Sequence, residues 1–308
     1  MASYLDNLTA RIATGLAALD EPTRRLHGDY LCAVQRDDGG FSGREGGGDL
    51  YYTGFALRGL AVLGRLEGSP AARAGDFLRG HLHAQVPVVD LVSLLYGCFV
   101  LERATGDNPL SAATSGWRDS VAQLLESLRR PDGGYARSPE AATGSMYHTF
   151  LVVLCQQLAD MELVDAPRTV EFTLARRRQD GGFVQLAPMK RSGTNPTAAA
   201  VGLLTALDAM PNDMMAGTIE FLREMQTDEG GLRANTRIPI ADLLSTFTGL
   251  VALGDLQAND AIDLNAARNY VGSLAAPDGG FCGAAWDSGH DVEYTFYGLG
   301  ALALLSSP

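Results

Sequence analysis

Two kinds of apolar pattern alternate along this chain. Stretches such as residues 166–179 carry apolar residues at three- and four-residue spacing, which predicts amphipathic helices with one buried face. Other stretches, such as 49–64, 145–158 and 242–254, are apolar almost all the way round. A helix that is apolar on every face is buried on both sides. The alternation therefore predicts outer amphipathic helices packed around an inner layer of buried helices.

A motif with two adjacent glycines recurs between the two kinds of stretch. Its copies are QRDDGGFSG, RRPDGGYAR, RRQDGGFVQ, MQTDEGGLR and AAPDGGFCG, with first glycines at Gly39, Gly133, Gly181, Gly230 and Gly279. The last three intervals are 48 or 49 residues, and the first is close to two such periods. A degenerate copy is therefore expected near residue 85. Because glycine accepts the left-handed conformation, each pair is expected to end the helix before it.

Six helical-hairpin repeats of about 48 residues predict an all-α fold, an α6–α6 barrel or toroid. The whole chain, residues 1–308, is expected to form this single domain. An open solenoid is the competing architecture, but solenoids usually need polar capping repeats. The final repeat is as apolar as the middle ones, which favours closure.

Composition narrows the classes of partner. With 46% hydrophobic and 19% charged residues the chain is globular, and its net charge of −12 argues against nucleic acid or an anionic membrane. No apolar run is clean and long enough for a transmembrane segment, and the N-terminus does not resemble a signal peptide. The four cysteines are far apart, which indicates a reducing, cytoplasmic setting.

A polar residue is expected to cap the start of each inner helix. These residues are Asp49, Asp90, Ser145, Asn195, Asp242 and Asp291. Side chains two and three residues later, and one turn deeper, are expected to point toward the barrel axis. They predict a mostly apolar funnel suited to an elongated hydrocarbon or another apolar small molecule. Its candidate substrate-binding residues are Tyr51, Tyr52, Phe55, Tyr147, Tyr294 and Tyr297.

The side chains two and three residues after the six caps form a ring around the barrel axis. Two titratable residues in this ring are candidate catalytic groups. Glu293 is the only carboxylate at its ring position, and burial against apolar neighbours would raise its pKa into the range of a proton donor. A first-turn glutamate that points to solvent is the alternative. His148 is the second candidate, with a hydrogen-bonded rim histidine as its alternative.

Basic residues occupy the loops that lead into the inner helices. Lys190, Arg191, Arg233 and Arg237 are the candidates to bind a phosphate or diphosphate head group at the funnel mouth. For any single one of them, ordinary solvated loop charge is the simpler explanation.

The repeated unit DGGF…D-x-x-[YH]-T resembles the β subunits of protein prenyltransferases, especially the Rab geranylgeranyltransferase type, and more distantly the terpene cyclases. The similarity covers nearly the whole chain. It implies an α6–α6 barrel whose aromatic cavity binds an isoprenoid diphosphate. Those β subunits work with a helical-repeat partner, which leaves a protein partner or a homodimer open for this chain.

The resemblance carries over the family's zinc site only in part. It places the ligands at the cap aspartate of the fifth inner helix, at a cysteine two residues later and at a histidine near the start of the sixth. Asp242 matches the first, but Leu244 and Tyr294 stand at the other two positions. Zinc needs three or four ligands, so the usual site is not expected and no cofactor is assigned. A rebuilt zinc or magnesium site from Asp242, Cys282 and His290 is the alternative.

Class II terpene cyclases provide a second resemblance. They begin an inner helix with Asp-x-Asp-Asp-Thr, and the middle acid protonates an alkene or epoxide. Here the segment is Asp291-Val292-Glu293-Tyr294-Thr295, with Glu293 in the place of the acid and Asp291 beside it as a further catalytic candidate. Tyr294 replaces the third acid.

These observations favour an isoprenoid-binding enzyme, prenyltransferase-like but without the usual zinc site. The alternatives are acid-initiated cyclisation from Glu293 and a non-catalytic lipid-binding or protein-interaction scaffold. A glycoside hydrolase ranks last, because no second ring carboxylate faces Glu293. The isoprenoid chain length and the acceptor stay open.

Overall fold

The structure is a computed structural model that describes residues 3–84 and 86–306. The chain divides into two compact units, and each is considered by itself. The middle unit comprises Met1–Leu5 and Arg118–Val271, and the terminal unit comprises Asp6–Trp117 and Gly272–Pro308. Helices dominate both units, with α1 (Tyr4–Leu16) beginning in one and continuing in the other.

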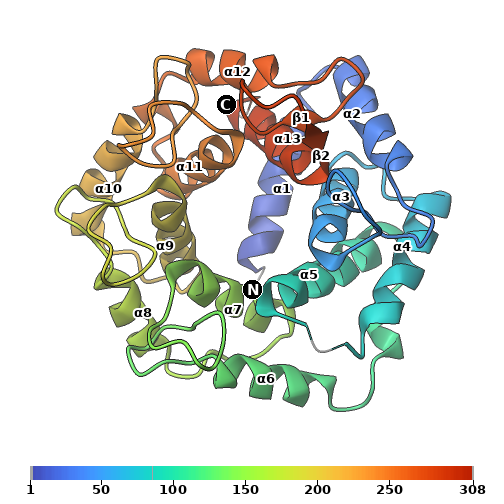
Figure 1. Cartoon of the computed structure of the whole chain (residues 1–308), viewed down its shortest axis with the longest axis horizontal. Helices are drawn as coiled ribbons and strands as arrows, with labels where there is room; N and C mark the ends of the chain where they lie inside the picture. The colour runs from blue at the N-terminus through green and yellow to red at the C-terminus, as the bar shows by residue number, and fades with distance from the viewer. Residues whose placement is uncertain (1–2, 85, 307–308) are drawn as a thin grey trace. The chain divides into compact units, whose positions relative to one another are not determined.

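In the terminal unit three apolar helices lie side by side. They are α3 (Leu50–Val62), α5 (Val88–Thr105) and α13 (Val292–Ser306), with α3 between the other two (Figure 1). The amphipathic helices α2 (Glu21–Ala33) and α4 (Gly68–His81) pack against α3 and α5. Since α13 belongs to the last repeat and α3 to the first, these two repeats are in contact.

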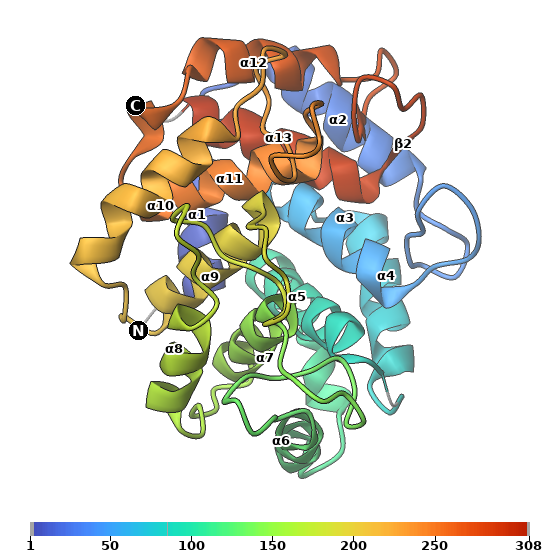
Figure 2. The same cartoon turned by 60° about the vertical axis from the view of Figure 1, so that its left-hand side comes forward.

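The middle unit has the same two-layer arrangement. Its apolar helices are α7 (Met146–Leu158), α9 (Thr194–Ala206) and α11 (Leu243–Asp255), with α9 next to both others (Figure 2). The amphipathic helices are α8 (Ala166–Leu174) and α10 (Asn212–Glu224), together with most of α6 (Trp117–Ser127) and α12 (Leu264–Ser273). The helices predicted from periodicity are thus present in both units. Residue 85 lies outside the described residues, but α5 follows it as the degenerate repeat predicts.

Four of the predicted helix caps are confirmed. Each accepts a hydrogen bond from the backbone N–H three residues later: Asp49, Ser145, Asp242 and Asp291. The other two predictions are wrong. Pro87 starts α5 early and leaves Asp90 inside its first turn, and Gly193 precedes α9 so that Asn195 lies within the helix.

The prediction that the glycine pairs end the outer helices is also wrong. Helix α8 ends at Leu174, well before Gly181. Gly181 instead closes a tight turn, donating to the Arg178 carbonyl at 3.0 Å with a φ of +86°. A Cβ at Gly181 would lie 2.0 Å from the Gly217 carbonyl oxygen on α10. Glycine is needed there by the positive φ and by this close approach to the neighbouring outer helix.

A buried threonine ties each of five loops to the inner helix that follows. Thr149 Oγ1 accepts the N–H of Tyr135 at 2.9 Å and donates to the Ser145 carbonyl at 2.8 Å. The equivalent N–H bonds, at 2.8–3.2 Å, join Phe41 to Thr53, Phe183 to Thr197, Leu232 to Thr246 and Phe281 to Thr295. All five threonines are fully buried. The hydroxyl therefore satisfies a backbone donor that water cannot reach.

Replacing this hydroxyl by a methyl group tests its contribution. We expect Thr149→Val to lower the free energy of unfolding by about 1–3 kcal/mol, because the Tyr135 N–H loses its acceptor. Thr149→Ser keeps the hydroxyl and loses only a methyl group, so it is the matched control. Chemical denaturation of both variants measures the difference. Equal stability of the two variants would contradict the role of the hydroxyl.

The last repeat holds its loop with a second contact in addition to the Thr295 bond. His27 on α2 accepts the Gly280 N–H on its Nδ1 at 3.0 Å, and its ring stacks on Phe281 with centroids 4.5 Å apart. Only a neutral ring can accept this bond. Burial lowers the pKa of His27 from 6.5 to about 4. The loop that leads into α13 therefore depends on an uncharged histidine.

We expect this histidine to make stability depend on pH. Because the unfolded chain binds the His27 proton more readily than the folded chain, the free energy of unfolding falls as the pH drops from 6.5 toward 4. The loss from this residue is on the order of 2–3 kcal/mol. His27→Gln keeps an acceptor but does not titrate, so denaturation curves at several pH values should show a smaller loss in the variant. An identical pH profile would exclude His27 as the cause.

Candidate functional site

Glu293 is the centre of a hydrogen-bonded cluster in the terminal unit. It lies in the first turn of α13, partly buried, and its Oε1 accepts from Tyr51 Oη at 2.6 Å and from Tyr297 Oη at 3.1 Å. Tyr51 is in the first turn of α3, and Tyr297 is one turn further along α13. The sequence predicts that all three side chains point toward the barrel axis, and the structure adds that they are in direct hydrogen-bonded contact.

Two opposing effects act on the pKa of Glu293. Burial raises it, and the hydrogen bonds from the two tyrosines lower it by favouring the carboxylate. Burial is the larger effect, so the pKa of Glu293 stands above 4.5. This is the shift that was expected for a carboxyl group among apolar neighbours.

Aromatic rings pack directly behind this cluster. Phe55 lies edge-on to both tyrosines, with its centroid 5.0 Å from that of Tyr51 and 5.1 Å from that of Tyr297. Phe296 adds a further ring 5.8 Å from Phe55. Since aromatic faces carry partial negative charge, the cluster favours a positive charge next to it.

Arg58 already occupies part of these faces and was not predicted. Its guanidinium carbon lies 4.0 Å from the ring centroid of Phe55, 4.8 Å from Phe296 and 5.3 Å from Tyr96. Its Nε donates to the carbonyl of Gly54 at 2.9 Å. The sequence does contain a signal for Arg58, because residues 51, 55 and 58 are spaced so that their side chains share one face of a helix.

Tyr52 and Tyr294 lie against the loops that precede their helices. A Cβ at Gly43 would be 2.7 Å from Tyr52 Cζ, and one at Gly283 would be 2.6 Å from Tyr294 Cζ. Other copies of the motif carry Arg137, Gln185 or Ala234 at this glycine position, and none has a tyrosine at the matching helix position. The glycine therefore makes room for the ring, and substrate contact by either tyrosine stays a prediction.

Asp291 acts as the cap of α13. Its Oδ1 accepts the Tyr294 N–H at 3.0 Å, and it is buried. Burial raises its pKa, while the cap bond and Arg44, whose Nε lies 3.7 Å from Oδ2, oppose that shift. Arg44 also pairs with Asp287. Asp291 thus has a structural role, and a catalytic one stays a prediction.

The middle unit contains His148 and Tyr147, at the start of α7. His148 Nδ1 is 2.8 Å from the hydroxyl of Ser145, which also accepts from Gln185 Nε2 at 2.9 Å. Burial lowers the pKa of His148. This hydrogen-bonded setting matches the alternative considered for His148. A catalytic role beside Glu293 stays a prediction, because the two residues belong to different units.

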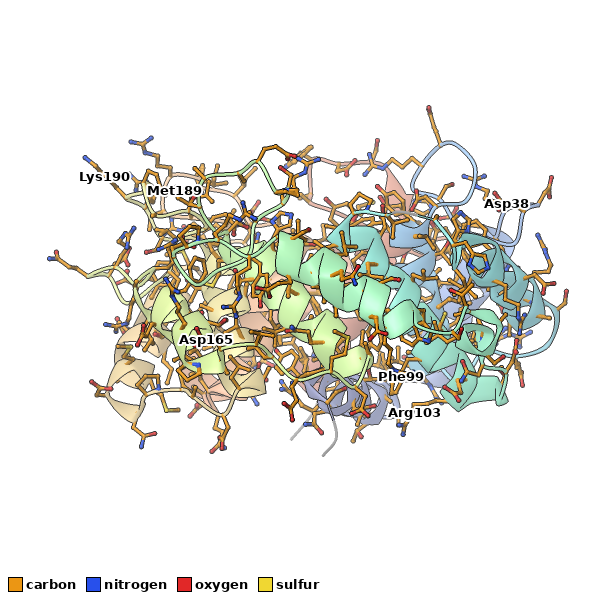
Figure 3. The ribbon with its side chains drawn as sticks, turned by 90° about the horizontal axis from the view of Figure 1, so that it is seen from below. Asp38, Phe99, Arg103, Asp165, Met189 and Lys190 are labelled. Atoms are coloured by element: carbon orange, nitrogen blue, oxygen red, sulfur yellow. The ribbon has the colours of Figure 1, made fainter. Side chains whose placement is uncertain are left out.

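The predicted head-group residues lie in two loops of the middle unit. Lys190, Arg191 and Arg237 are exposed, and Arg233 is partly exposed. Figure 3 shows Lys190 beside Met189 at the outside of its loop. Arg191 Nη1 donates to Thr236 Oγ1 at 2.7 Å, which joins the two loops. Their binding of a diphosphate stays a prediction.

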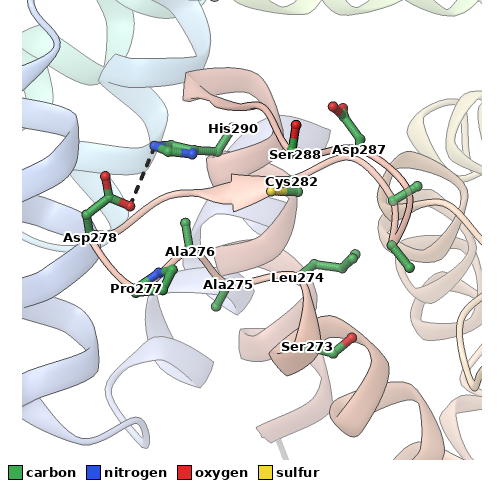
Figure 4. A pocket seen from close by; sticks show the side chains of 12 residues that line it. Ser273, Leu274, Ala275, Ala276, Pro277, Asp278, Cys282, Asp287, Ser288 and His290 are labelled. Atoms are coloured by element: carbon green, nitrogen blue, oxygen red, sulfur yellow. Dashed lines mark ion pairs between the residues drawn. The ribbon is translucent and has the colours of Figure 1, made fainter.

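Cys282 and His290 face each other across a short sheet in the terminal unit. They are register partners of β1 (Phe281–Cys282) and β2 (His290–Asp291). They line a cavity of about 310 Å³, where His290 Nε2 lies 3.9 Å from Asp278 Oδ1 (Figure 4). Burial raises the pKa of Cys282, which disfavours the thiolate that binds metals.

The alternative metal site gains no support from this geometry. Asp242 belongs to the middle unit, whereas Cys282 and His290 belong to the terminal unit. Within the ranges that the structure describes, no three His, Cys, Asp or Glu side chains are grouped so that they could hold a metal ion. Likewise, none of the described helices is long and apolar enough to cross a bilayer.

Comparison with known sequences assigns the chain to a family. Residues 16–76 and 75–306 match the sequence model of the prenyltransferase alpha-alpha toroid domain, and the chain belongs to that family. The predicted α/α toroid fold class is confirmed by this match and by similar solved structures.

Three solved structures show how widely this fold is used. Protein geranylgeranyltransferase-I from Candida albicans, complexed with GGPP, is 17% identical with a TM-score of 0.75, covering 91% of this chain and 90% of its own. The type II terpene cyclase MstE from Scytonema is 12% identical with a TM-score of 0.62, covering 96% and 98%. The GH76A alpha-1,6-mannanase from Salegentibacter is 11% identical with a TM-score of 0.62, covering 92% and 98%. At these identities the likeness defines the fold alone.

The state of Glu293 can be measured without a substrate. We expect its pKa, followed by NMR of a carbon-labelled carboxyl group, to exceed 4.5. Tyr51→Phe removes a donor that favours the carboxylate, so it should raise this pKa further. Tyr52→Phe, which changes a neighbouring tyrosine that does not donate to Glu293 Oε1, is the control and should change it less. A pKa at or below 4.5 in the unaltered protein would refute the assignment.

Proposed function

We propose that the chain binds an isoprenoid against the aromatic cluster and that Glu293 protonates it to start a cyclisation. One observation supports this proposal above the others. A partly buried carboxyl group with a raised pKa is held by two tyrosine hydroxyls next to a set of aromatic rings. Such a group is protonated at a higher pH than an exposed glutamate, which supports a role as a general acid.

The proposed step balances in charge and atoms. The Glu293 proton passes to one carbon of an alkene, whose π electrons form the new C–H bond and leave a carbocation on the other carbon. A second alkene of the same chain attacks that cation and closes a ring. Loss of a proton from a neighbouring carbon, to the Glu293 carboxylate or to water, gives a product isomeric with the substrate.

The surrounding residues suit both charges that appear in this step. Hydrogen bonds from Tyr51 and Tyr297 to Oε1 stabilise the carboxylate that remains. The aromatic rings around the carboxyl group would favour the positive charge on the substrate, in competition with Arg58, whose guanidinium already lies over Phe55 and Phe296. The two charges appear together, so their stabilisation lowers the barrier to the step.

Related structures suggest which substrates to test first. Geranylgeranyltransferase-I was solved with GGPP, and MstE was solved with geranylgeranyl dihydroxybenzoate as its substrate. We therefore propose as the substrate class a geranylgeranyl chain, either alone or attached to a head group.

The four cysteines are free thiols, which is consistent with the cytoplasmic location proposed from the sequence.

Incubation with geranylgeranyl substrates in D₂O tests the proposal. We expect a cyclised product that carries a solvent-derived deuterium on carbon, detected by mass spectrometry and NMR. Glu293→Gln should reduce turnover by about 100-fold or more, because it removes the general acid. It should leave substrate affinity nearly unchanged. Glu171→Gln, an exposed glutamate on α8, is the matched control.

Other outcomes would point to the alternatives. Release of diphosphate without carbon-bound deuterium would indicate prenyl transfer or ionisation of the substrate. Stable binding of isoprenoids without turnover would indicate a lipid carrier. Full activity of Glu293→Gln would exclude protonation by Glu293.

A further inference from the structure

Two neighbouring loops of the middle unit expose aliphatic side chains. Residues 185–193 lead into α9 and residues 233–241 lead into α11. Leu186, Met189, Ile238 and Ile240 are 37%, 44%, 39% and 40% exposed. They are four of the eight large hydrophobic residues that are exposed in the part of the chain described, so exposed apolar surface is concentrated on these loops.

The same loops carry positive charge and no negative charge. Their basic residues are Lys190, Arg191, Arg233 and Arg237, and neither loop contains an aspartate or glutamate. The chain as a whole has a net charge of −12, and Lys190 is its only lysine. The corresponding loops of the first two motif copies contain Glu45 and Glu140. The charge is therefore a property of these two loops and not of the repeat.

Hydrogen bonds hold the two loops next to each other. Arg191 Nη1 donates to Thr236 Oγ1 at 2.7 Å, and Thr194 N donates to the Ala234 carbonyl at 2.9 Å. Arg178 Nη2 donates to the Ala187 carbonyl at 2.9 Å, which ties the first loop to the tight turn that Gly181 closes. The eight side chains named above belong to these two joined loops and are here called the basic-aliphatic face. Arg233 lies at its inner edge, where its Nη2 donates to the Glu224 carbonyl at 3.0 Å.

We propose that the basic-aliphatic face docks the protein on an anionic lipid bilayer. Its arginines and lysine would contact lipid phosphates, and its aliphatic side chains would enter the interface between head groups and acyl chains. Protein-binding interfaces are enriched in arginine and methionine, which these loops contain, but also in aromatic residues, which the loops lack. Such interfaces are depleted of lysine, whereas these loops carry the chain's single lysine. The proposal does not depend on the chemistry of Glu293.

The expectation that net charge excludes an anionic membrane has to be refined for this face. At physiological salt a charge acts over about 8 Å, so distant acidic residues are largely screened from a surface that touches the loops. The bilayer then meets the exposed Lys190, Arg191 and Arg237 together with four aliphatic side chains. The acidic remainder of the protein would orient away from the bilayer.

Vesicle sedimentation of the purified full chain tests this surface. We expect binding to mixed phosphatidylcholine–phosphatidylserine vesicles, little binding to pure phosphatidylcholine, and weaker binding at high salt. Lys190→Gln with Arg237→Gln should lower the affinity about fivefold for each charge removed. Arg25→Gln with Arg103→Gln removes the same charge from residues whose side chains are 73% and 69% exposed, and should have little effect.

A second pair of variants separates insertion from simple attraction. Met189→Ser with Ile238→Ser should weaken binding even at low salt, whereas Leu26→Ser with Val164→Ser, exposed elsewhere, should not. Thermal unfolding checks that all variants stay folded. The proposal fails if the wild-type protein stays in the supernatant with anionic vesicles, or if both members of each matched pair behave alike. It also fails if Lys190→Gln with Arg237→Gln abolishes binding of free diphosphate but not of vesicles, since that would make these residues a head-group site.

Discussion

The bond between a buried threonine hydroxyl and the N–H that follows the glycine pair constrains the rest of this structure. Each repeat has to lead the chain from an outer helix into an inner one, and the loop that does so has backbone groups shielded from water. In five repeats the hydroxyl accepts that N–H. The aromatic or leucine side chain after the glycines is then buried, and the start of the inner helix is placed relative to the loop. An unmade bond of this kind would cost more than an ordinary surface contact.

This constraint explains where the candidate site lies. With the start of each inner helix held by its threonine and its cap, the residue two positions after the cap has a defined direction. Tyr51 follows Asp49 in this way, and Glu293 follows Asp291. Because α13 packs on α3, these two side chains meet in a 2.6 Å hydrogen bond. The repeat determines where each of these side chains stands on its helix. The contact between the last and first repeats then brings Tyr51 and Glu293 together.

Much of this arrangement could be predicted from the sequence, for physical reasons. Helix periodicity and the recurring motif depend on local burial, so they identified the inner helices, Glu293 and its aromatic neighbours Tyr51 and Tyr297. The errors arose where local backbone chemistry overrides the repeat, as at Pro87 before α5 and Gly193 before α9. The glycine pairs were misassigned because left-handed glycine serves tight turns as well as helix ends.

Arg58 shows a different limit of sequence reasoning. A pattern of apolar and polar positions assigns arginine to the polar class and therefore to solvent. Its guanidinium instead lies over ring faces, where the aromatic quadrupole offsets part of the cost of removing the charge from water. The spacing of 51, 55 and 58 puts this arginine on the aromatic face of α3, but the packing of α3, α5 and α13 is needed to show that three rings converge on it. The net charge of the chain likewise fails to predict a local surface. It sums over all charged residues and so hides the four cations of the basic-aliphatic face.

Two opposing effects set the pKa of Glu293, and the proposed proton transfer depends on both. Tyr51 and Tyr297 stabilise the carboxylate, while the surrounding rings destabilise it by excluding water. If a cation forms nearby, as proposed, the aromatic rings would favour it and the tyrosines would favour the new carboxylate. In the proposed step, burial therefore favours the protonated acid beforehand, and the tyrosine hydrogen bonds would stabilise the carboxylate that remains.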